Sequence, residues 1–416
     1  MAAHFRRSVD TSYFMWQSML EGALKMHVPR MCKVQSANSN ANGVASLMNS
    51  FLPSLEIGDL KIYPPIIQGG MGVRVSGPRL ASAVSNTGAL GVIASVGVGE
   101  TGKYDGMNFT DRSACGLRDM IREARSMTKM PVAVNIMCAL TNYESLVRVA
   151  VEEKIDAIIS GAGLPLALPG LVKTLSVKLM PIVSSGRAAR IICKSWLAKH
   201  GRLPDAFIVE GPMAGGHIGF TMDDALAGDR ETSGLSRVLP EVLEVAAKFT
   251  LPSGKPIPVV AAGGIFDGSD IVNCLKQGAS GVQMGTRFVC TEECDASRAF
   301  KDQYINAKKE DIIVLKSPVG MPLRVIRNAF VDRILRGERT NFECKYHCLS
   351  TCQPGTTPYC IAKALVNAQL GELDSGFAPC GSNAYRIHSL VSVKELVAEL
   401  VAQAKAILSP LPSAGS

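Results

Sequence analysis

Eight short apolar segments recur along the middle of this chain, and they restrict the fold more than any other feature. Each is mainly apolar instead of alternating with polar residues, which is typical of parallel strands covered on both faces. Helical patterns separate them over about 250 residues, the usual size of a (β/α)8 barrel. The segments are residues 65–67, 90–94, 131–135, 155–159, 179–183, 206–209, 257–262 and 281–284. We therefore predict an α/β fold, a (β/α)8 TIM barrel. A doubly wound open sheet is the alternative, because a strand count does not prove closure.

Small and amide side chains, with few carboxylates, follow these segments. In a barrel of this kind the active site lies at the carboxyl ends of the strands. The ends here include Gln68-Gly-Gly-Met71, Asn135-Ile-Met137 and Ser160-Gly-Ala-Gly163. Such a mouth suits a flat, uncharged ring system held by backbone amides. It lacks the ligand cluster of a metallohydrolase and the carboxylate pair of a glycosidase.

Two successive glycine turns indicate a phosphate site. Gly263 and Gly264 follow the seventh segment, while Gly285 and Thr286 follow the eighth. In these barrels the same two loops commonly bind phosphate through backbone N–H groups and a helix N-terminus. Glycine lets the backbone approach the anion without a Cβ atom in the way. Tight packing would explain one such turn, but two in consecutive repeats favour phosphate.

A single histidine stands on a glycine-rich turn after the sixth segment, within Glu210-Gly-Pro-Met-Ala-Gly-Gly-His-Ile-Gly219. Of the six histidines, only His217 follows a convincing strand. An imidazole with a pKa near neutrality can exchange a proton at physiological pH, which makes His217 the candidate catalytic residue. The alternative is a histidine that is hydrogen-bonded for structure alone. Glu210 is either an orienting carboxylate or a strand-end carboxylate paired with a neighbouring repeat.

Taken together, these segments resemble the nitronate monooxygenase family, formerly 2-nitropropane dioxygenase. The resemblance runs from about residue 57 to residue 322 and rests on the ordered combination of motifs. FMN-type enoyl-acyl-carrier-protein reductases belong to the same superfamily and share the Gly-Gly-His element. The motifs are residues 68–72, 135–137, 160–163, 210–219, 262–265 and 283–288.

The resemblance implies an oxidoreductase that binds FMN. It places His217 over the flavin ring as base or polarising group, and it places the FMN phosphate on the two glycine turns. The implied cofactor-binding residues are Gly70, Met71, Asn135, Ser160, Gly161, Gly215, Gly216, Gly263, Gly264, Gly285 and Thr286. The first expected activity is oxidation of alkyl nitronates with O₂; the alternative is NAD(P)H-dependent reduction of enoyl thioesters. His217 could serve either reaction, so it does not separate them.

Four of the twelve cysteines lie within a short segment near the C-terminus: Cys344, Cys348, Cys352 and Cys360. A cysteine at every fourth residue would place three thiols on one face of a helix. Cys360, after a Pro-Gly turn, could then fold back as a fourth ligand. The expected occupants are a [4Fe-4S] cluster or a zinc ion, with ordinary thiols as the alternative, because the spacing matches neither the usual zinc nor the usual ferredoxin pattern.

Composition limits the remaining classes of function. The net charge of +8 comes without a Lys/Arg-rich block, which argues against nucleic-acid binding, and no apolar run is long enough to cross a membrane. Residues 1–54 are basic and poor in acidic residues, as in an organellar transit peptide or a disordered extension. The expected location is cytoplasmic, or a mitochondrion or plastid if the transit peptide is real. We divide the chain into this extension, a barrel over 55–322, and a helical, cysteine-rich C-terminal extension over 323–416.

Overall fold

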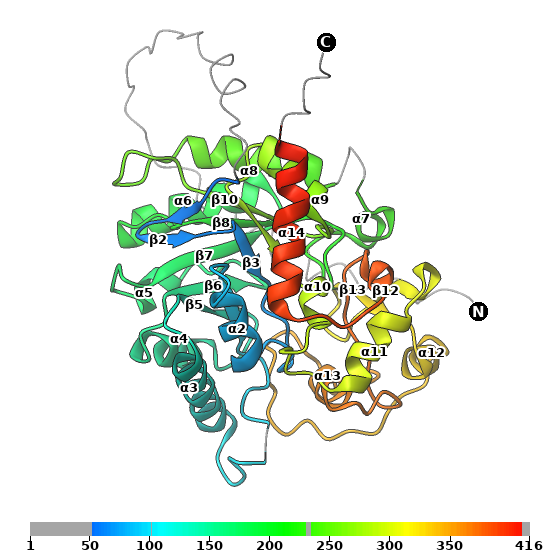
Figure 1. The fold of residues 1–416 in the computed structure, drawn as a ribbon. Coiled ribbons are helices and arrows are strands. Elements are labelled where there is room, and N and C mark those ends of the chain that lie inside the picture. The colour runs from blue at the N-terminus through cyan, green and yellow to red at the C-terminus, as the bar shows by residue number, and fades with distance from the viewer. Residues whose placement is uncertain (1–51, 101, 230–233, 410–416) are drawn as a thin grey trace, which may run out of the picture. The chain divides into compact units, whose positions relative to one another are not determined.

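A ring of eight parallel strands forms the centre of the computed structural model, which describes residues 52–100, 102–229 and 234–409 (Figure 1). The strand order is β3-β11-β10-β8-β7-β6-β5-β4, and a parallel bridge from Ile67 to Leu90 joins the two end strands. The ring is therefore closed: the TIM barrel is confirmed and the open sheet is wrong. The strands are β3 Ile66–Gln68, β4 Gly91–Ala94, β5 Val132–Met137, β6 Ala157–Gly161, β7 Lys178–Val183, β8 Phe207–Glu210, β10 Val259–Ala262 and β11 Gly281–Met284.

The strands are mainly apolar because both of their faces are buried. One set of side chains fills the inside of the ring, where the hairpin of β1 (Leu55–Ile57) and β2 (Leu60–Ile62) adds Leu55, Ile57 and Ile62 to the same cluster. The other set packs against surrounding helices. Those helices are α2 Pro78–Ser85, α3 Phe109–Met127, α4 Tyr143–Glu152, α5 Leu168–Leu171, α6 Gly186–His200, α7 Met222–Ala227, α8 Leu235–Ala247, α9 Gly268–Lys276 and α10 Thr286–Val289.

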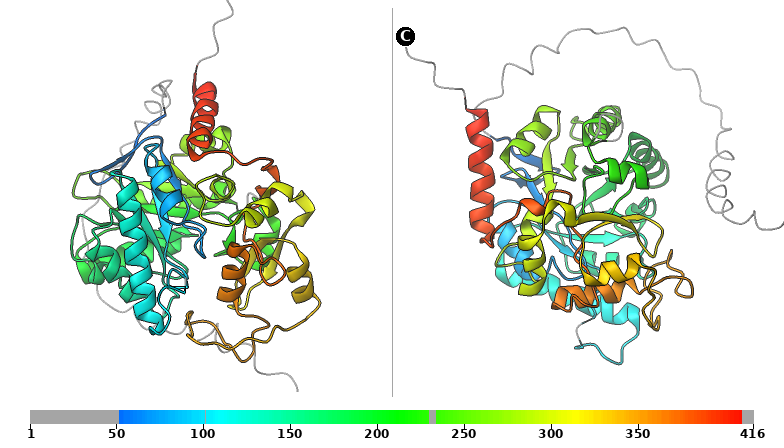
Figure 2. Two further views of the ribbon diagram at one scale, coloured as in Figure 1. Left: turned by 60° about the horizontal axis from the view of Figure 1, so that its bottom comes forward. Right: turned by 90° about the vertical axis from the view of Figure 1, so that its right-hand side faces the viewer.

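The chain beyond the barrel adds a small sheet and further helices. The elements from α11 to α13 lie together on one side of the barrel (Figure 2). β12 (Ile312–Lys316) and β13 (Pro322–Ile326) form an antiparallel pair, and β13 also pairs with the two-residue strand β9 (Gly216–His217). The C-terminal helix α14 (Val393–Leu408) packs on α9 and α2 (Figure 1). The other elements are α11 Arg298–Asn306, η1 Lys309–Asp311, α12 Ala329–Leu335, α13 Ile361–Leu370 and η2 Ala384–Arg386.

Two predictions about the ends of the chain have different outcomes. The helical character predicted for the C-terminal extension is confirmed by α13 and α14. The transit peptide or disordered extension predicted for residues 1–54 lies almost wholly outside the described residues. The boundaries between the three parts of the chain, at residues 54 and 322, stay predictions. Within the described ranges, no helix is long and apolar enough to cross a membrane.

Candidate active site

The predicted site residues lie at the carboxyl ends of the barrel strands, and several of them meet across the ring. A Cβ atom added to Gly70 would lie 2.4 Å from the Cβ of Asn135, so this backbone passes directly over β5. A Cβ atom added to Gly285 would lie 3.4 Å from the sulfur of Met71. The loops after β3 and β11 and the end of β5 therefore form one continuous surface.

His217 is held at this surface by a strand from outside the barrel. Its backbone pairs with Leu323 of β13, and Ile218 donates its N–H to the carbonyl of Pro322 at 2.9 Å. The imidazole Nε2 is buried, and no described residue gives it a hydrogen-bond partner. Burial lowers the pKa of His217 from its ordinary 6.5 to about 4. The ring is therefore neutral at physiological pH and keeps one nitrogen available to a ligand.

Arg324 fixes the turn that carries His217, and the sequence analysis missed it. The residue is buried in β13, and its guanidinium donates to the carbonyls of Pro212 at 2.8 Å, Ala214, and Ala225 at 2.6 Å. Burial lowers the pKa of this guanidinium. One signal was present in the sequence, since Arg324 is the only charged residue inside the apolar strand β13.

Glu210 ends β8 just before the same turn. Burial raises the pKa of its carboxyl group from 4.5 to about 7, because no neighbouring positive charge compensates the loss of solvent. Between about pH 5 and 6 both Glu210 and His217 are therefore uncharged. In this pH range neither residue adds charge to the mouth, which suits the flat, uncharged ring system that the residue types already favoured.

The low pKa of His217 can be measured by NMR titration. We expect its ring carbon-bound proton to show no protonation step between pH 5 and 8, whereas in the unfolded chain it should titrate near 6.5. Folding therefore becomes less favourable as the pH falls from 6.5 toward 4, because only the unfolded chain binds the proton there. The spectrum of His217→Gln identifies the resonance. A protonation step near pH 6.5 in the folded protein would contradict the burial of His217.

The glycine turns after β10 and β11 have the backbone of an anion cradle. Gly263 and Gly264 have φ values of +94° and +85°, which side chains rarely adopt. In the described part of the chain, the N–H groups of Gly264, Ile265 and Gly285 donate no hydrogen bond. Gly264, Ile265 and Gly285 are half-buried, and N–H groups without protein partners at such positions are donors that a ligand can use.

Several side-chain atoms of the mouth also lack hydrogen-bond partners. These atoms show whether the residues present fit FMN. Among the described residues, His217 Nε2, Gln283 Oε1, Ser95 Oγ and Ser382 Oγ are buried without a hydrogen bond. Buried polar atoms are rarely left unpaired in proteins, so their gathering around one mouth indicates a polar ligand. The residues present fit a cofactor with a polar ring and a phosphate.

Ser160 belongs to a hydrogen-bonded group that the sequence analysis did not anticipate. Its Oγ lies 2.9 Å from the hydroxyl of Tyr143 and 3.4 Å from the sulfur of Cys138, and it donates to the carbonyl of Ile136. Burial raises the pKa of both Tyr143 and Cys138. This group is therefore neutral, and Ser160 is already bonded to protein before any cofactor contact.

The four clustered cysteines do not form the predicted helix. Residues 340–360 contain no helix, and His347 has a φ of +44°, which breaks the helical path between Cys344 and Cys352. The thiols still influence one another, since burial and the nearby Cys360, Cys344 and Cys352 raise the pKa of Cys348 to about 11. Across the described ranges, no group of three or more His, Cys, Asp or Glu side chains could hold a metal ion. The predicted iron–sulfur cluster or zinc ion is thus unsupported.

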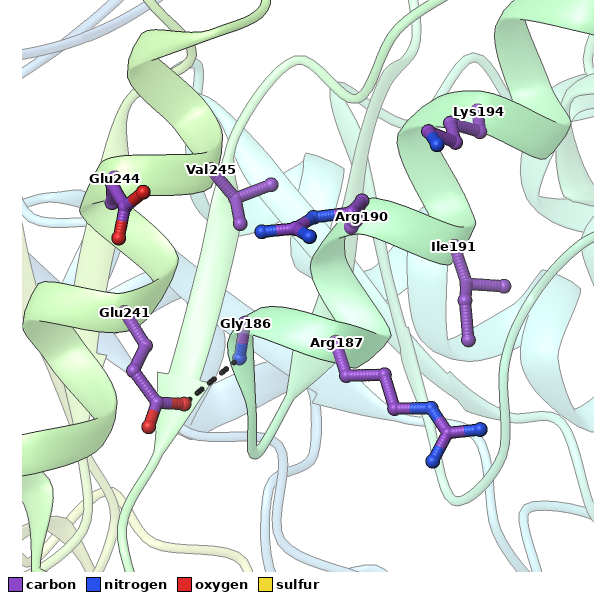
Figure 3. Close-up of a pocket in the computed structure, with 8 residues that line it drawn as sticks. All are labelled: Gly186, Arg187, Arg190, Ile191, Lys194, Glu241, Glu244 and Val245. Atoms are coloured by element: carbon purple, nitrogen blue, oxygen red, sulfur yellow. Dashed lines mark hydrogen bonds between the residues drawn. The ribbon is translucent and has the colours of Figure 1, made fainter.

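A pocket of about 360 Å³ lies outside the barrel, between α6 and α8 (Figure 3). Arg187, Arg190 and Lys194 line one side of it, and Glu241 and Glu244 line the other. None of these residues is among the predicted site residues. Ser185, just before the pocket, accepts a hydrogen bond from the N–H of Ala188 at 3.2 Å and so caps the N-terminus of α6.

Comparison with known proteins gives the family of the chain and agrees with the barrel fold. A family model described as nitronate monooxygenase matches residues 54–146 and 124–403. The chain is 31% identical over 278 residues to a (3aS,4S,5R,7aS)-5-hydroxy-7a-methyl-1-oxo-octahydro-1H-indene-4-carboxyl-CoA dehydrogenase of Mycobacterium tuberculosis, covering 67% of each chain. It is 28% identical over 300 residues to a probable nitronate monooxygenase of Staphylococcus aureus, covering 67% of this chain and 79% of that one.

Solved structures share the fold. FabK from Thermotoga maritima is 29% identical, with a TM-score of 0.64 over 83% of this chain and 94% of that one. A nitroalkane oxidase from Streptomyces ansochromogenes, 22% identical, has a TM-score of 0.64 over 84% of this chain and 99% of that one, and it supports the fold alone. Since the family model spans most of the barrel and its extension, the chain belongs to the nitronate monooxygenase family of oxidoreductases.

Proposed function

We propose that this protein is an FMN-dependent oxidoreductase that oxidises alkyl nitronates with O₂. The observation that carries the proposal is the buried, neutral imidazole of His217 with Nε2 left unpaired at the barrel mouth. A group with a pKa of about 4 is a weak base toward a carbon-bound proton at neutral pH. A preformed nitronate needs no such abstraction, and its oxygen can accept a hydrogen bond from the imidazole N–H.

The proposed FMN site uses the residues that the family resemblance implies. The phosphate would be held by Gly263, Gly264, Gly285 and Thr286. The N–H groups at these two turns that donate no hydrogen bond support this placement. Gly70, Met71 and Asn135 would lie beside the ring, with Ser160 and Gly161 nearby. Gly215 and Gly216 would lie at the flavin edge, next to His217. When bound, FMN takes electrons from the substrate and passes them to O₂.

A second candidate is oxidation or reduction of an acyl thioester. It is favoured by the names of two relatives, a carboxyl-CoA dehydrogenase at 31% identity and FabK at 29%. In this reaction the imidazole N–H of His217 would bond to the thioester carbonyl. The same neutral histidine serves both substrates, so the electron partner has to be measured.

Anaerobic stopped-flow mixing separates the two candidates. We expect propionate-3-nitronate to bleach the flavin absorbance of the purified protein, with colour returning on admission of O₂. NADH and NADPH, with or without crotonyl-CoA, should bleach it slowly or not at all. Rapid bleaching by a nicotinamide followed by reoxidation with crotonyl-CoA would replace the nitronate proposal with the thioester one.

The cysteine segment is not part of the proposed function, because no described group of side chains there could hold a metal. FMN should therefore account for the visible spectrum of anaerobically purified protein. Iron and acid-labile sulfide in stoichiometric amounts, lost in the quadruple cysteine-to-serine variant, would show that these cysteines hold a cluster.

A further inference from the structure

A segment close to the C-terminus lies across the glycine cradle. We call residues 379–386 the C-terminal arm; it lies within the connection from α13 to α14 and includes η2. Gly381 donates its N–H to Thr286 Oγ1 at 2.9 Å, and Ser382 donates its N–H to the carbonyl of Met213 at 3.1 Å. Asn383 Nδ2 donates to the carbonyl of Gly264 at 2.6 Å. The arm thus contacts the cradle formed by the turns after β10 and β11, and it also contacts the loop after β8.

The arm is seated firmly against these loops. A Cβ atom on Gly215 would lie 2.5 Å from the carbonyl carbon of Cys380, so the two backbones touch. A Cβ atom on Gly381 would lie 2.9 Å from Thr286 Oγ1. Arg386 adds an ion pair to Asp267 at 2.7 Å and lies over the ring of Phe266. The arm is therefore part of the wall of the cradle.

The helix that follows the cradle has its N-terminal donors already occupied. Asp267 caps α9 and accepts the N–H groups of Ser269 and Asp270 at 3.0 and 3.2 Å. The N–H of Gly268 donates to Gln403 Oε1 of α14 at 2.9 Å. The helix N-terminus, which the sequence analysis expected to hold phosphate, has therefore no N–H left in its first turn for an anion.

Free donors are found on the arm side of the cradle. Ser382 Oγ is buried without a hydrogen bond among the described residues. Thr286 Oγ1 accepts from Gly381, which leaves its own hydrogen free to donate. These two hydroxyls accompany the unpaired N–H groups of Gly264, Ile265 and Gly285. Hydroxyls and backbone N–H groups are usual ligands of a phosphate monoester.

We propose that the C-terminal arm completes the FMN phosphate site, with Ser382 as a hydroxyl ligand of the phosphate and Gly381 and Asn383 as positioning residues. Gly381 orients the hydroxyl of Thr286, and Asn383 fixes the carbonyl of Gly264 so that this turn keeps its N–H groups toward the anion. The inference rests on the proposed use of FMN. It assigns the phosphate to the arm and the two glycine turns instead of to α9.

Flavin affinities of the full-length protein test this assignment. The protein is stripped of flavin by dialysis and titrated with FMN, with riboflavin, and with FMN in the presence of inorganic phosphate. Ser382→Ala should weaken FMN about 10-fold or more, as expected for a lost hydrogen bond to a charged group. Riboflavin, which lacks the phosphate, should bind both proteins equally, and Ser382→Thr should restore FMN affinity because it keeps the hydroxyl.

A serine in the first turn of α9 provides the matched control. Ser269 is exposed and bonds only to Asp267, so Ser269→Ala should change neither affinity. If Ser382→Ala weakens FMN and riboflavin alike, or neither, the assignment to Ser382 is wrong. If Ser269→Ala weakens FMN selectively, α9 is the phosphate site after all. Failure of the wild-type protein to bind either flavin would instead refute the proposed function itself. Should Ser382→Ala not fold, an unchanged FMN-to-riboflavin ratio in Asn383→Ala would also overturn the proposal.

Discussion

Replacing His217 with alanine should slow turnover by about 10²–10³-fold, the range for loss of one hydrogen-bond donor that stabilises developing negative charge on the substrate. The imidazole Nε2 is the unpaired buried nitrogen at the mouth, and its backbone is held by β13 independently of the side chain. Because the alanine keeps that pairing, FMN should still bind with nearly unchanged affinity. Turnover is measured as O₂ consumption with propionate-3-nitronate, and flavin content is measured from the visible spectrum.

Two further histidine variants sharpen this result. His217→Gln keeps an N–H donor without a titratable ring, so it should recover part of the rate if hydrogen-bond donation is the main contribution. His200→Ala, on the exposed end of α6, should leave turnover unchanged. Wild-type rates in His217→Ala would remove this residue from the catalytic assignment. A large loss in His200→Ala would show that the assay responds to general damage.

The barrel was predictable from sequence because its strands are buried on both faces. Each apolar segment matched a strand to within one or two residues, for example residues 206–209 against β8 at Phe207–Glu210. The position of His217 followed from the same count, since a turn after a barrel strand must lie at the mouth. The strands and the turn that carries His217 can be located from local signals, namely apolar composition, glycine turns and the start of a helix.

Contacts between distant segments were not predictable in this way. Arg324 is 112 residues from the Pro212 carbonyl that it holds, and Gly381 is 95 residues from Thr286. No local pattern indicates that β13 pairs with the Gly-Gly-His turn or that the C-terminal arm covers the cradle. The helix predicted through Cys344, Cys348 and Cys352 was wrong for a local reason. That prediction relied on the spacing of the cysteines and gave too little weight to the weak helical preference of the residues between them.

Arg324 should have the largest effect on stability of any residue near the site. Its guanidinium satisfies the carbonyls of Pro212, Ala214 and Ala225, all in buried surroundings. Arg324→Met fills similar space but leaves three acceptors unpaired, at about 1–3 kcal/mol each. We expect the free energy of unfolding in urea to fall by at least about 3 kcal/mol. Arg327→Met, three residues along and exposed, removes only the ion pair to Asp332 and should cost less than about 1 kcal/mol.

The same variant should also affect catalysis, because the three carbonyls belong to the segments around His217. At a temperature where Arg324→Met is still folded, we expect turnover to fall while the affinity for riboflavin changes little, since the barrel strands are untouched. Arg324→Lys should recover only part of the rate, because one ammonium cannot reproduce a planar fork that reaches carbonyls on two segments. Equal losses of unfolding free energy in Arg324→Met and Arg327→Met would show that the buried guanidinium does not hold the turn. Full turnover in folded Arg324→Met would show that His217 keeps its position without it.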